Sequence, residues 1–338
     1  MRRLLGALTV VAVLAATGAC SDDDGGGDVG PAGSPSGSAS TGSPDGETLR
    51  SPTDGPTGAP EQQLPQAPPV TERFVPARTP RELATRLTVA EDLARASADG
   101  GEVRRAAAFE TQLLYRQLAR RPAWEERVRA AVPRRYRADV SAHVHARRSL
   151  RSLHTTLTDE LPAWRIAEPA PLADLLRFYR KGERVHGVPW EVLAAINLVE
   201  TGFGRIRGVS SAGAQGPMQF IPSTWAAYGE GDVDDPHDAI LAAARYLAAS
   251  GGAGGRDGLE DALYSYNNHS GYVAGILAYA SVLERDPQAL RTLSAWQIIY
   301  LSTIGDLWLP VGYDEERPVP VRRYARQHPE RHLGTATD

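Results

Sequence analysis

The segment from Ser21 to about Pro69 limits where this chain can fold. It consists almost entirely of Gly, Ser, Pro, Asp and Thr, and it includes the runs SDDDGGGD and GSPSGSASTGSP. Because it has almost no large apolar side chains, it cannot bury enough surface to offset the backbone entropy that is lost on folding. We therefore expect residues 20–70 to be a disordered tether with a reach of roughly 40 Å, and we expect the folded body to lie in the residues that follow.

The residues before this segment have the pattern of an export signal. Met1-Arg2-Arg3 is a short positive region, and the apolar run from Leu4 to Ala16 is shorter than the about 20 residues that span a bilayer. Thr17-Gly18-Ala19-Cys20 follows and ends in the only cysteine of the 338-residue chain. It resembles the lipobox of bacterial lipoproteins, although Thr17 stands where an aliphatic residue is usual.

This pattern predicts a signal peptide at residues 1–19 and lipidation of Cys20. The mature protein would then be extracytoplasmic and lipid-anchored to the membrane that faces the cell wall. The alternative is a plain secretory signal with an incidental cysteine.

Composition excludes several classes of function. Lys and Arg number 37 against 41 Asp and Glu, so the net charge of -4 provides no overall basic field for nucleic acid. A single cysteine excludes an intramolecular disulfide and a cysteine-based zinc cluster. No HExxH motif occurs, and we expect neither a metal nor a cofactor.

Proline and glycine mark a series of helices within residues 71–165. Thr79-Pro80 has the pattern of an N-cap followed by proline at the first helical position. Further helices are predicted after Gly101, at Pro122 and at Pro133, and no convincing alternating strand appears among them. We expect a helical region here. Its many arginines are more typical of a solvated helix face than of a surface for anionic polymers.

A carboxylate lies on the apolar face of the helix that is predicted to follow Gly187. In the segment PWEVLAAINLVETGFG, Leu193, Ile196 and Glu200 are three and four residues apart and share the face expected to meet the core. Burial disfavours the charged form, so the pKa of Glu200 should rise toward the range that suits a general acid. The alternative is a residue at the helix end whose carboxylate reaches solvent.

The next segment, GVSSAGAQGPMQFIPSTW, is suited to binding an extended polymer. Its small residues allow close approach to the backbone, while Gln219 and Phe220 offer an amide and an aromatic face for sugars. A short helix is expected from Pro222 to near Trp225. The alternative is an ordinary surface connection.

A third segment, DALYSYNNHSGYV, places tyrosine and asparagine side chains at a helix end before Gly271. Tyr264, Tyr266, Asn267 and Asn268 suit recognition of N-acetyl and hydroxyl groups. A helix-stopping asparagine beside packed tyrosines would give the same pattern for structural reasons alone.

Together, these segments resemble the lytic murein transglycosylases, whose SLT-type catalytic domain is related to goose-type lysozyme. The resemblance rests on Glu200-Thr201, Gly216-Pro217-Met218-Gln219 and Tyr266-Asn267. In that family the first motif is usually Glu-Ser and the second Gly-Leu-Met-Gln, so Thr201 keeps the hydroxyl and Pro217 stiffens the loop.

The resemblance implies a mostly α, lysozyme-like catalytic domain, which we place at residues 166–325. It would be followed by a flexible tail at residues 326–338. The segment IGDLWLPVGYDEERPVP is expected to close this domain as a proline-rich tail. The helices before Pro171 are not covered by the resemblance. We expect residues 71–165 to be a helical accessory region, which could bind a cell-wall synthesis or division protein.

The same resemblance implies cleavage of the β-1,4 bond between N-acetylmuramic acid and N-acetylglucosamine in peptidoglycan glycan strands. Glu200 would protonate the leaving oxygen and then act as base on the muramoyl 6-hydroxyl, which gives a 1,6-anhydro end. The predicted substrate contacts are Thr201, Met218, Gln219, Tyr266 and Asn267, to which we add Phe220 and Tyr246. A muramidase that uses water and a catalytically silent peptidoglycan-binding lipoprotein are the alternatives.

The acidic segment GEGDVDDPHDAILAAARYL could supply a second carboxylate or a calcium site. Its candidates are Glu230, Asp232, Asp234 and Asp235. The EF-hand pattern is absent, however. A simpler prediction is that Asp235 caps a helix that has Pro236 at its first position and Asp238 in its first turn.

Overall fold

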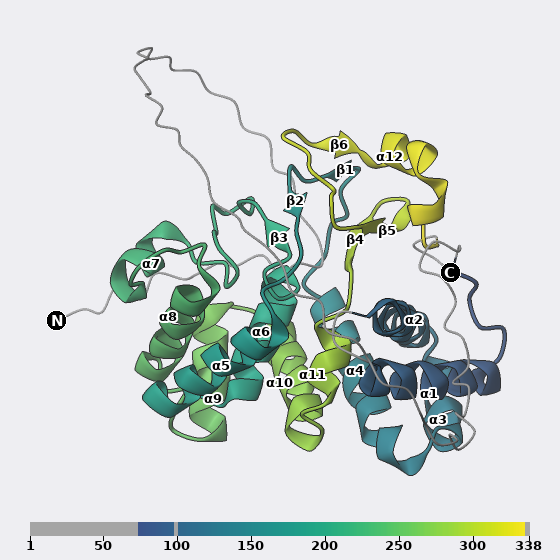
Figure 1. The fold of residues 1–338 in the computed structure, drawn as a ribbon, viewed down its shortest axis with the longest axis horizontal. Helices are drawn as coiled ribbons and strands as arrows, with labels where there is room; N and C mark the ends of the chain where they lie inside the picture. The colour runs from purple at the N-terminus through teal and green to yellow at the C-terminus, as the bar shows by residue number, and fades with distance from the viewer. Residues whose placement is uncertain (1–73, 98–100, 335–338) are drawn as a thin grey trace, which may run out of the picture. The chain divides into compact units, whose positions relative to one another are not determined.

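The computed structural model describes residues 74–97 and 101–334, and in this part the protein is mostly helical (Figure 1). The predicted signal peptide, Cys20 and the predicted tether lie outside the described residues. None of the helices in the described ranges is both long and apolar enough to cross a membrane. The helices are α1 (Pro80–Ala96), α2 (Glu102–Ala119), α3 (Pro122–Ala131), η1 (Arg134–Tyr136), α4 (Arg137–Arg151), α5 (Leu172–His186), α6 (Trp190–Thr201), α7 (Pro222–Tyr228), α8 (Pro236–Ala249), α9 (Arg256–Tyr266), α10 (Ser270–Arg285), α11 (Ala289–Leu293), α12 (Val321–Gln327) and η2 (Pro329–Arg331).

Most of the predicted helix starts are confirmed. Thr79 caps α1 by accepting a hydrogen bond from Glu82 N at 3.1 Å, and the proline that follows occupies the first turn. At Pro133 the prediction needs correction. Its backbone is extended, and its carbonyl accepts a 2.9 Å hydrogen bond from Tyr136 N, three residues on. A short 3-10 turn therefore comes between Pro133 and α4.

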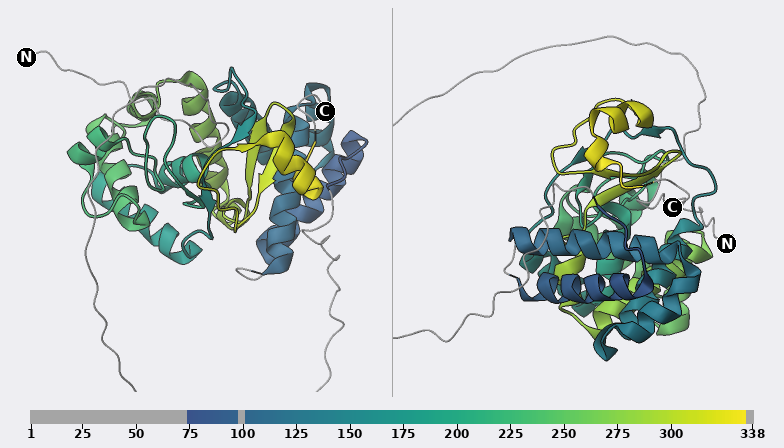
Figure 2. Two further views of the ribbon diagram at one scale, coloured as in Figure 1. Left: turned by 90° about the horizontal axis from the view of Figure 1, so that it is seen from above. Right: turned by 90° about the vertical axis from the view of Figure 1, so that its right-hand side faces the viewer.

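Helix α10 lies at the centre of the fold, in contact with α4 and α6. Figures 1 and 2 show α1–α4 on one side of it and α5–α9 on the other. The approach to α4 is close because α10 has glycine at the crossing. A Cβ on Gly275 would lie 2.5 Å from Leu150 Cγ, and one on Gly271 would lie 2.5 Å from Ser149 O. Only glycine permits this packing without a shift of one helix.

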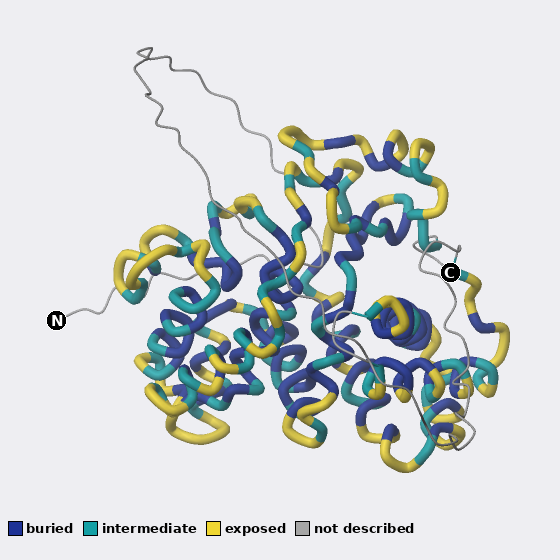
Figure 3. Tube along the Cα trace, viewed as in Figure 1, coloured by how far each residue is buried: buried dark blue, intermediate teal, exposed yellow. Residues whose placement is uncertain are grey.

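One hydrophobic core includes helices from both sides of α10. It runs from Ala77 through Trp296, so helices before and after the expected boundary at residue 165 share it. Figure 3 shows that most of α6 and α10 is buried. The division into accessory and catalytic regions stays a prediction from sequence.

Within residues 74–97 and 101–334, the strands form three short antiparallel ribbons. They are β1 (Glu160–Leu161) with β6 (Val319–Pro320), β2 (Arg165–Ile166) with β3 (Ile206–Arg207), and β4 (Ile298–Ser302) with β5 (Gly305–Leu309). Residues 298–309, part of which was expected to belong to a proline-rich tail, thus form a hairpin. Gly305 permits its tight turn with a φ of 115°. Residues 326–331 of the expected flexible tail lie in α12 and η2 or between them.

A buried ion pair attaches this hairpin to α2. Arg116 Nε donates to Asp306 Oδ2 at 2.7 Å, and Arg120 also binds the same carboxylate. Burial alone would raise the pKa of Asp306, but the two arginines outweigh it and lower the pKa to about 2. The hairpin is therefore held by a charged contact between residues far apart in the sequence.

Candidate active site

Glu200 is the second-last residue of α6, on the face that meets the core. The helix ends because Gly202 adopts the left-handed conformation, with a φ of 60°. A Cβ at this position would lie 2.6 Å from Ile298 Cδ1, so the end of the Ile298 side chain would have to shift. The Glu200 side chain is 0% exposed, as the helical phase predicted.

The two carboxyl oxygens of Glu200 have different surroundings. Tyr272, in the first turn of α10, donates a hydrogen bond from its hydroxyl to Oε1 at 2.7 Å. Oε2 is buried and has no hydrogen-bond partner among the described residues. Burial raises the pKa of Glu200 to about 8, although the Tyr272 hydrogen bond lowers it in part. The carboxyl is therefore mainly protonated at neutral pH, and Oε2 is free to carry the proton.

Thr201 joins the end of α6 to the loop before α7. Its hydroxyl donates to Pro217 O at 2.7 Å and accepts from Gly204 N at 2.9 Å. Asn197 Nδ2 donates to the same Pro217 carbonyl at 2.8 Å, and Asn197 Oδ1 accepts from the buried Tyr179 hydroxyl at 2.6 Å. The backbone around Pro217 is thus fixed relative to Glu200 by buried side chains.

The loop is closed by its own backbone. Gln215 and Phe220 exchange two hydrogen bonds of 2.9 Å, and the Gln219 side chain donates to Gly216 O at 3.0 Å. Gln219 has a positive φ of 51°, which is uncommon for a residue other than glycine and is typical of functional loops. Met218 and Phe220 are buried, so within the described structure their side chains serve as packing for the loop.

Tyrosines from α8, α9 and α10 enclose this site. Tyr266 donates to Met218 O at 2.6 Å, and its ring is parallel to that of Tyr272 with centroids 6.3 Å apart. Tyr246 donates to Ser265 O at 2.8 Å and packs edge-on against Tyr266. Asn267 follows as the residue after α9 and is 5% exposed.

Residues 178–286 match the family model described as the transglycosylase SLT domain. No match was found among curated proteins or among solved structures. The match supports a domain of the lytic transglycosylase type, with peptidoglycan as its substrate. It lies inside the expected catalytic domain of residues 166–325 and includes Glu200, the loop at Gln219 and Tyr266-Asn267.

The SLT domain brings the predicted site residues together. Glu200 and Thr201 end one helix, Thr201 binds the loop of Met218 and Gln219, and Tyr266 binds the Met218 carbonyl. Phe220 and Tyr246 both pack edge-on against Tyr266. Contact of these side chains with sugar stays a prediction, as does the corresponding role of Asn267.

Sequence reasoning missed three residues of the SLT domain site: Tyr272, Asn197 and Tyr179. Asn197 had a visible signal, because it is a buried polar residue within an otherwise apolar helix and lies four residues before Thr201. Tyr272 had only a weak one, a tyrosine at the start of an apolar helix. Its contact with Glu200 spans 72 residues of sequence and depends on the packing of α10 against α6.

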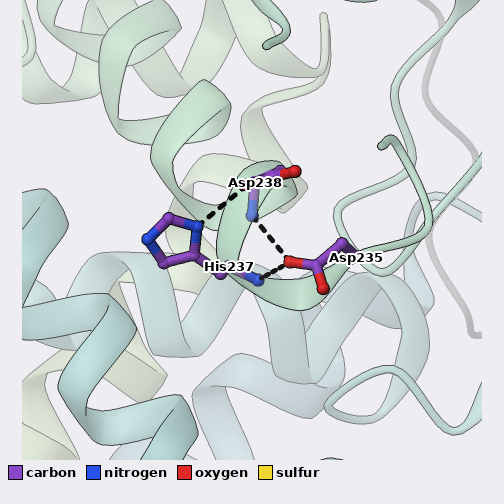
Figure 4. Close-up of side chains that lie close together, drawn as sticks. All are labelled: Asp235, His237 and Asp238. Carbon is purple, nitrogen blue, oxygen red and sulfur yellow. Dashed lines mark hydrogen bonds and ion pairs between the residues drawn. The ribbon is translucent and has the colours of Figure 1, made fainter. Parts of the chain in front are cut away.

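The acidic segment of the SLT domain forms a helix start (Figure 4). As predicted, Asp235 caps α8 by accepting from His237 N at 2.8 Å and from Asp238 N at 3.1 Å. The carboxylates and ring nitrogen of this group lie within 4.8 Å of one another, a spacing that a metal ion could bridge. However, Lys181 Nζ lies 2.8 Å from His237 Nε2, and an ammonium there disfavours a cation.

Two of the other acidic candidates, Glu230 and Asp232, also have partners. Glu230 forms a 3.0 Å ion pair with Arg245, and Asp232 accepts a 2.9 Å hydrogen bond from Asp234 N. Within the described residues, Tyr272 is the hydrogen-bond partner of the Glu200 carboxyl. The arrangement can therefore offer one buried neutral acid, beside a loop fixed by Thr201.

Proposed function

We propose that this chain is a peptidoglycan lytic transglycosylase that uses Glu200 first as general acid and then as general base. The observation that carries the proposal is the pair of unlike oxygens on Glu200. Oε1 accepts the Tyr272 hydrogen bond at 2.7 Å, and buried Oε2 has no partner among the described residues. A carboxyl with a pKa of about 8 holds its proton at neutral pH and can give it to a bound group.

The proposed reaction cleaves the β-1,4 bond between N-acetylmuramic acid and N-acetylglucosamine. The proton on Glu200 passes to the glycosidic oxygen as the bond from that oxygen to the muramoyl C1 breaks. The Glu200 carboxylate, which keeps the Tyr272 hydrogen bond, then takes the proton of the muramoyl 6-hydroxyl. That oxygen bonds to C1, which closes the 1,6-anhydro ring and leaves Glu200 protonated for another cycle.

Two of the four acidic candidates have other contacts, which favours this reaction over a two-carboxylate hydrolysis. Retaining and inverting glycosidases place two carboxyl groups on either side of the bond they cleave. Here Glu230 binds Arg245, and Asp235 caps α8. A single carboxyl that acts twice is consistent with these contacts.

Product analysis of digested cell wall tests the proposal. We expect the wild-type protein to release muropeptides with anhydro ends and Glu200→Gln to release almost none. Products one water heavier would instead show a muramidase. Equal behaviour of the two proteins, with binding to the wall but no turnover, would show a silent peptidoglycan-binding protein.

We also propose that the mature protein is extracytoplasmic and anchored through lipidated Cys20. The support is the sequence pattern at residues 1–20, which lies outside the described residues. A Cys20→Ala variant should lose acylation and leave the membrane fraction while its soluble form still digests isolated walls. Retention of acyl groups on that variant would reject the anchor.

A role for the accessory helices in binding a cell-wall synthesis or division protein remains part of the same proposal. The test compares the proteins that co-purify from crosslinked cells with the full-length protein and with a variant that lacks residues 71–165. If the deletion variant still co-purifies with the same proteins, the proposed partner role is rejected. The shared core predicts that the deletion also destabilises α10, so folding must be measured in parallel.

A further inference from the structure

A cleft lies beside the loop that carries Gln219. Its volume is about 800 Å³, and its walls are the β2–β3 ribbon, the backbone at Gln215-Gly216 and the turn that follows β5. This volume is within the range of clefts that hold a ligand the size of a short peptide. Gly208, Gly216 and Gly312 line it, and a Cβ on Gly312 would meet no atom within 4 Å, so a ligand can approach the backbone closely at that position.

Two arginines face each other in this cleft. Arg165 and Arg207 are direct partners in the antiparallel register of β2 and β3, and both line the cleft. Like charges directly opposite each other on one face of a ribbon are unfavourable. In the described residues neither guanidinium forms an ion pair that would offset this repulsion; Arg207 only donates to Asp234 O at 3.4 Å. A bound carboxylate between them would relieve it.

Two carboxylates line the same cleft and form no ion pair with these arginines in the described residues, although Asp314 is the antiparallel bridge partner of Arg165. Asp234 and Asp314 are exposed, and no ion pair involves either of them in the described part of the chain. A cleft with two unpaired cations and two unpaired anions complements a ligand that carries both charges. The sugar rings of a glycan strand are neutral, whereas its stem peptides carry carboxylates and an amine.

The cleft is continuous with the loop of residues 215–220. Gly216, which lines it, accepts the Gln219 side-chain hydrogen bond, and Gln215, which also lines it, pairs with Phe220. We propose that this cleft binds the stem peptide of a muramic acid residue, with Arg165 and Arg207 on a peptide carboxylate and Asp234 or Asp314 near the peptide amine. This inference rests on the proposed function, because it assigns the peptide of that same substrate.

Binding measurements on full-length Glu200→Gln protein test the inference without turnover. The ligands are a chitin oligosaccharide, a peptide-free glycan with a lactyl carboxylate, a disaccharide-peptide with free carboxylates and the same disaccharide-peptide with its carboxylates amidated. Adding Arg165→Gln and Arg207→Gln should weaken binding of the free disaccharide-peptide by about tenfold or more. Binding of the chitin oligosaccharide and of the amidated peptide should change less than about twofold.

The matched control is Arg322→Gln with Arg323→Gln, which removes two exposed arginines of α12 outside the cleft. It should leave all four affinities unchanged. Equal loss with the control pair would show a general charge effect, and equal loss with the peptide-free glycan would assign the arginines to the lactyl carboxylate. Either result, or no loss at all, overturns the inference.

Failure of the proposed function would look different. The wild-type protein would then release no anhydro products from any wall, while the binding series would still report on the cleft. Conversely, anhydro products together with unchanged peptide affinity in the arginine variant would leave the reaction intact and reject the peptide site.

Discussion

The Tyr272 hydroxyl lies 2.7 Å from Glu200 Oε1 and connects the first turn of α10 to the last turn of α6. Glu200 has no charged partner in the described structure, so this hydrogen bond is the contact that favours its ionised form. Burial disfavours the ionised form, and its effect on the Glu200 pKa is larger than that of the hydrogen bond. The site therefore combines a proton that is retained at neutral pH with a donor that remains when the proton leaves.

Glu200 should reduce the stability of the protein as pH rises. Its pKa is about 8 in the folded state against an ordinary value of 4.5, so the folded state retains a proton that the unfolded state releases between these values. Glu200→Gln should therefore gain free energy of unfolding over wild type, by an amount that grows from about pH 4.5 to about pH 8. Each pKa unit corresponds to about 1.4 kcal/mol.

Denaturant unfolding of both proteins across this pH range measures the difference. The exposed Glu316→Gln is the matched control and should show no such trend. A constant difference between wild type and Glu200→Gln at all pH values would mean that Glu200 ionises as freely in the folded protein as in the unfolded chain.

Loss of the Tyr272 hydroxyl should change the pH dependence of cleavage. Tyr272→Phe removes the hydrogen bond that lowers the Glu200 pKa, so the alkaline limit of kcat/KM should move to higher pH. The maximum rate should fall by about tenfold or more, because the Glu200 carboxylate formed during the reaction loses its donor.

The measurement is a pH profile of muropeptide release. Tyr313→Phe is the control, since it loses a 2.8 Å hydrogen bond to Pro162 O in a different hydrophobic cluster. Its profile should match wild type. An alkaline limit of Tyr272→Phe that moves to lower pH would contradict the role given to this hydroxyl.

Local patterns carried the features that could be predicted from sequence. The burial of Glu200 follows from its position within one helix, and the caps at Thr79 and Asp235 follow from residues adjacent to each helix start. Backbone geometry fixes these relationships over a few residues. The SLT domain match likewise covers a contiguous stretch, residues 178–286.

Contacts between distant segments could not be predicted in this way. Tyr272 reaches Glu200 across 72 residues, and Arg116 reaches Asp306 across 190. Both depend on which helix faces pack together. The α4–α10 crossing in turn depends on two glycines that cannot be told from ordinary helix residues in the sequence. The β4–β5 hairpin was missed because its strands are buried and do not alternate between apolar and polar residues.

The loop of residues 215–220 should require glycine at position 216 for two reasons. Its φ is 72°, and a Cβ there would lie 2.0 Å from Val233 O, which belongs to the backbone and cannot rotate away. Gly213 provides a matched control, with a φ of 78° and no atom within 4 Å of the added Cβ. Gly213→Ala should cost about 1 kcal/mol for backbone strain alone, whereas Gly216→Ala should cost more than that and also reduce activity.

Unfolding free energies and rates of wall digestion of the two variants check this expectation. The activity loss should exceed what the lower stability explains, because displacement at Gly216 moves the carbonyl that binds Gln219. Equal destabilisation by both substitutions would show that the contact with Val233 O relaxes without cost.

The ion pair of Asp306 with Arg116 should contribute more to stability than a surface pair does. Asp306→Asn leaves the buried Arg116 and the partly exposed Arg120 without their carboxylate and should cost about 3–5 kcal/mol. Glu126→Gln breaks the pair with Arg129, in which the Glu126 side chain is 75% exposed, and should cost less than about 1 kcal/mol.

The pKa of Asp306 is about 2, below its ordinary 3.8, so the pair stabilises the fold above about pH 4 and loses this contribution as pH falls toward 2. Acid unfolding followed by circular dichroism should therefore show a smaller stability gap between wild type and Asp306→Asn at pH 2 than at pH 6. A gap that stays the same across this range would mean that Asp306 keeps its ordinary pKa and that the hairpin is held to α2 by packing alone.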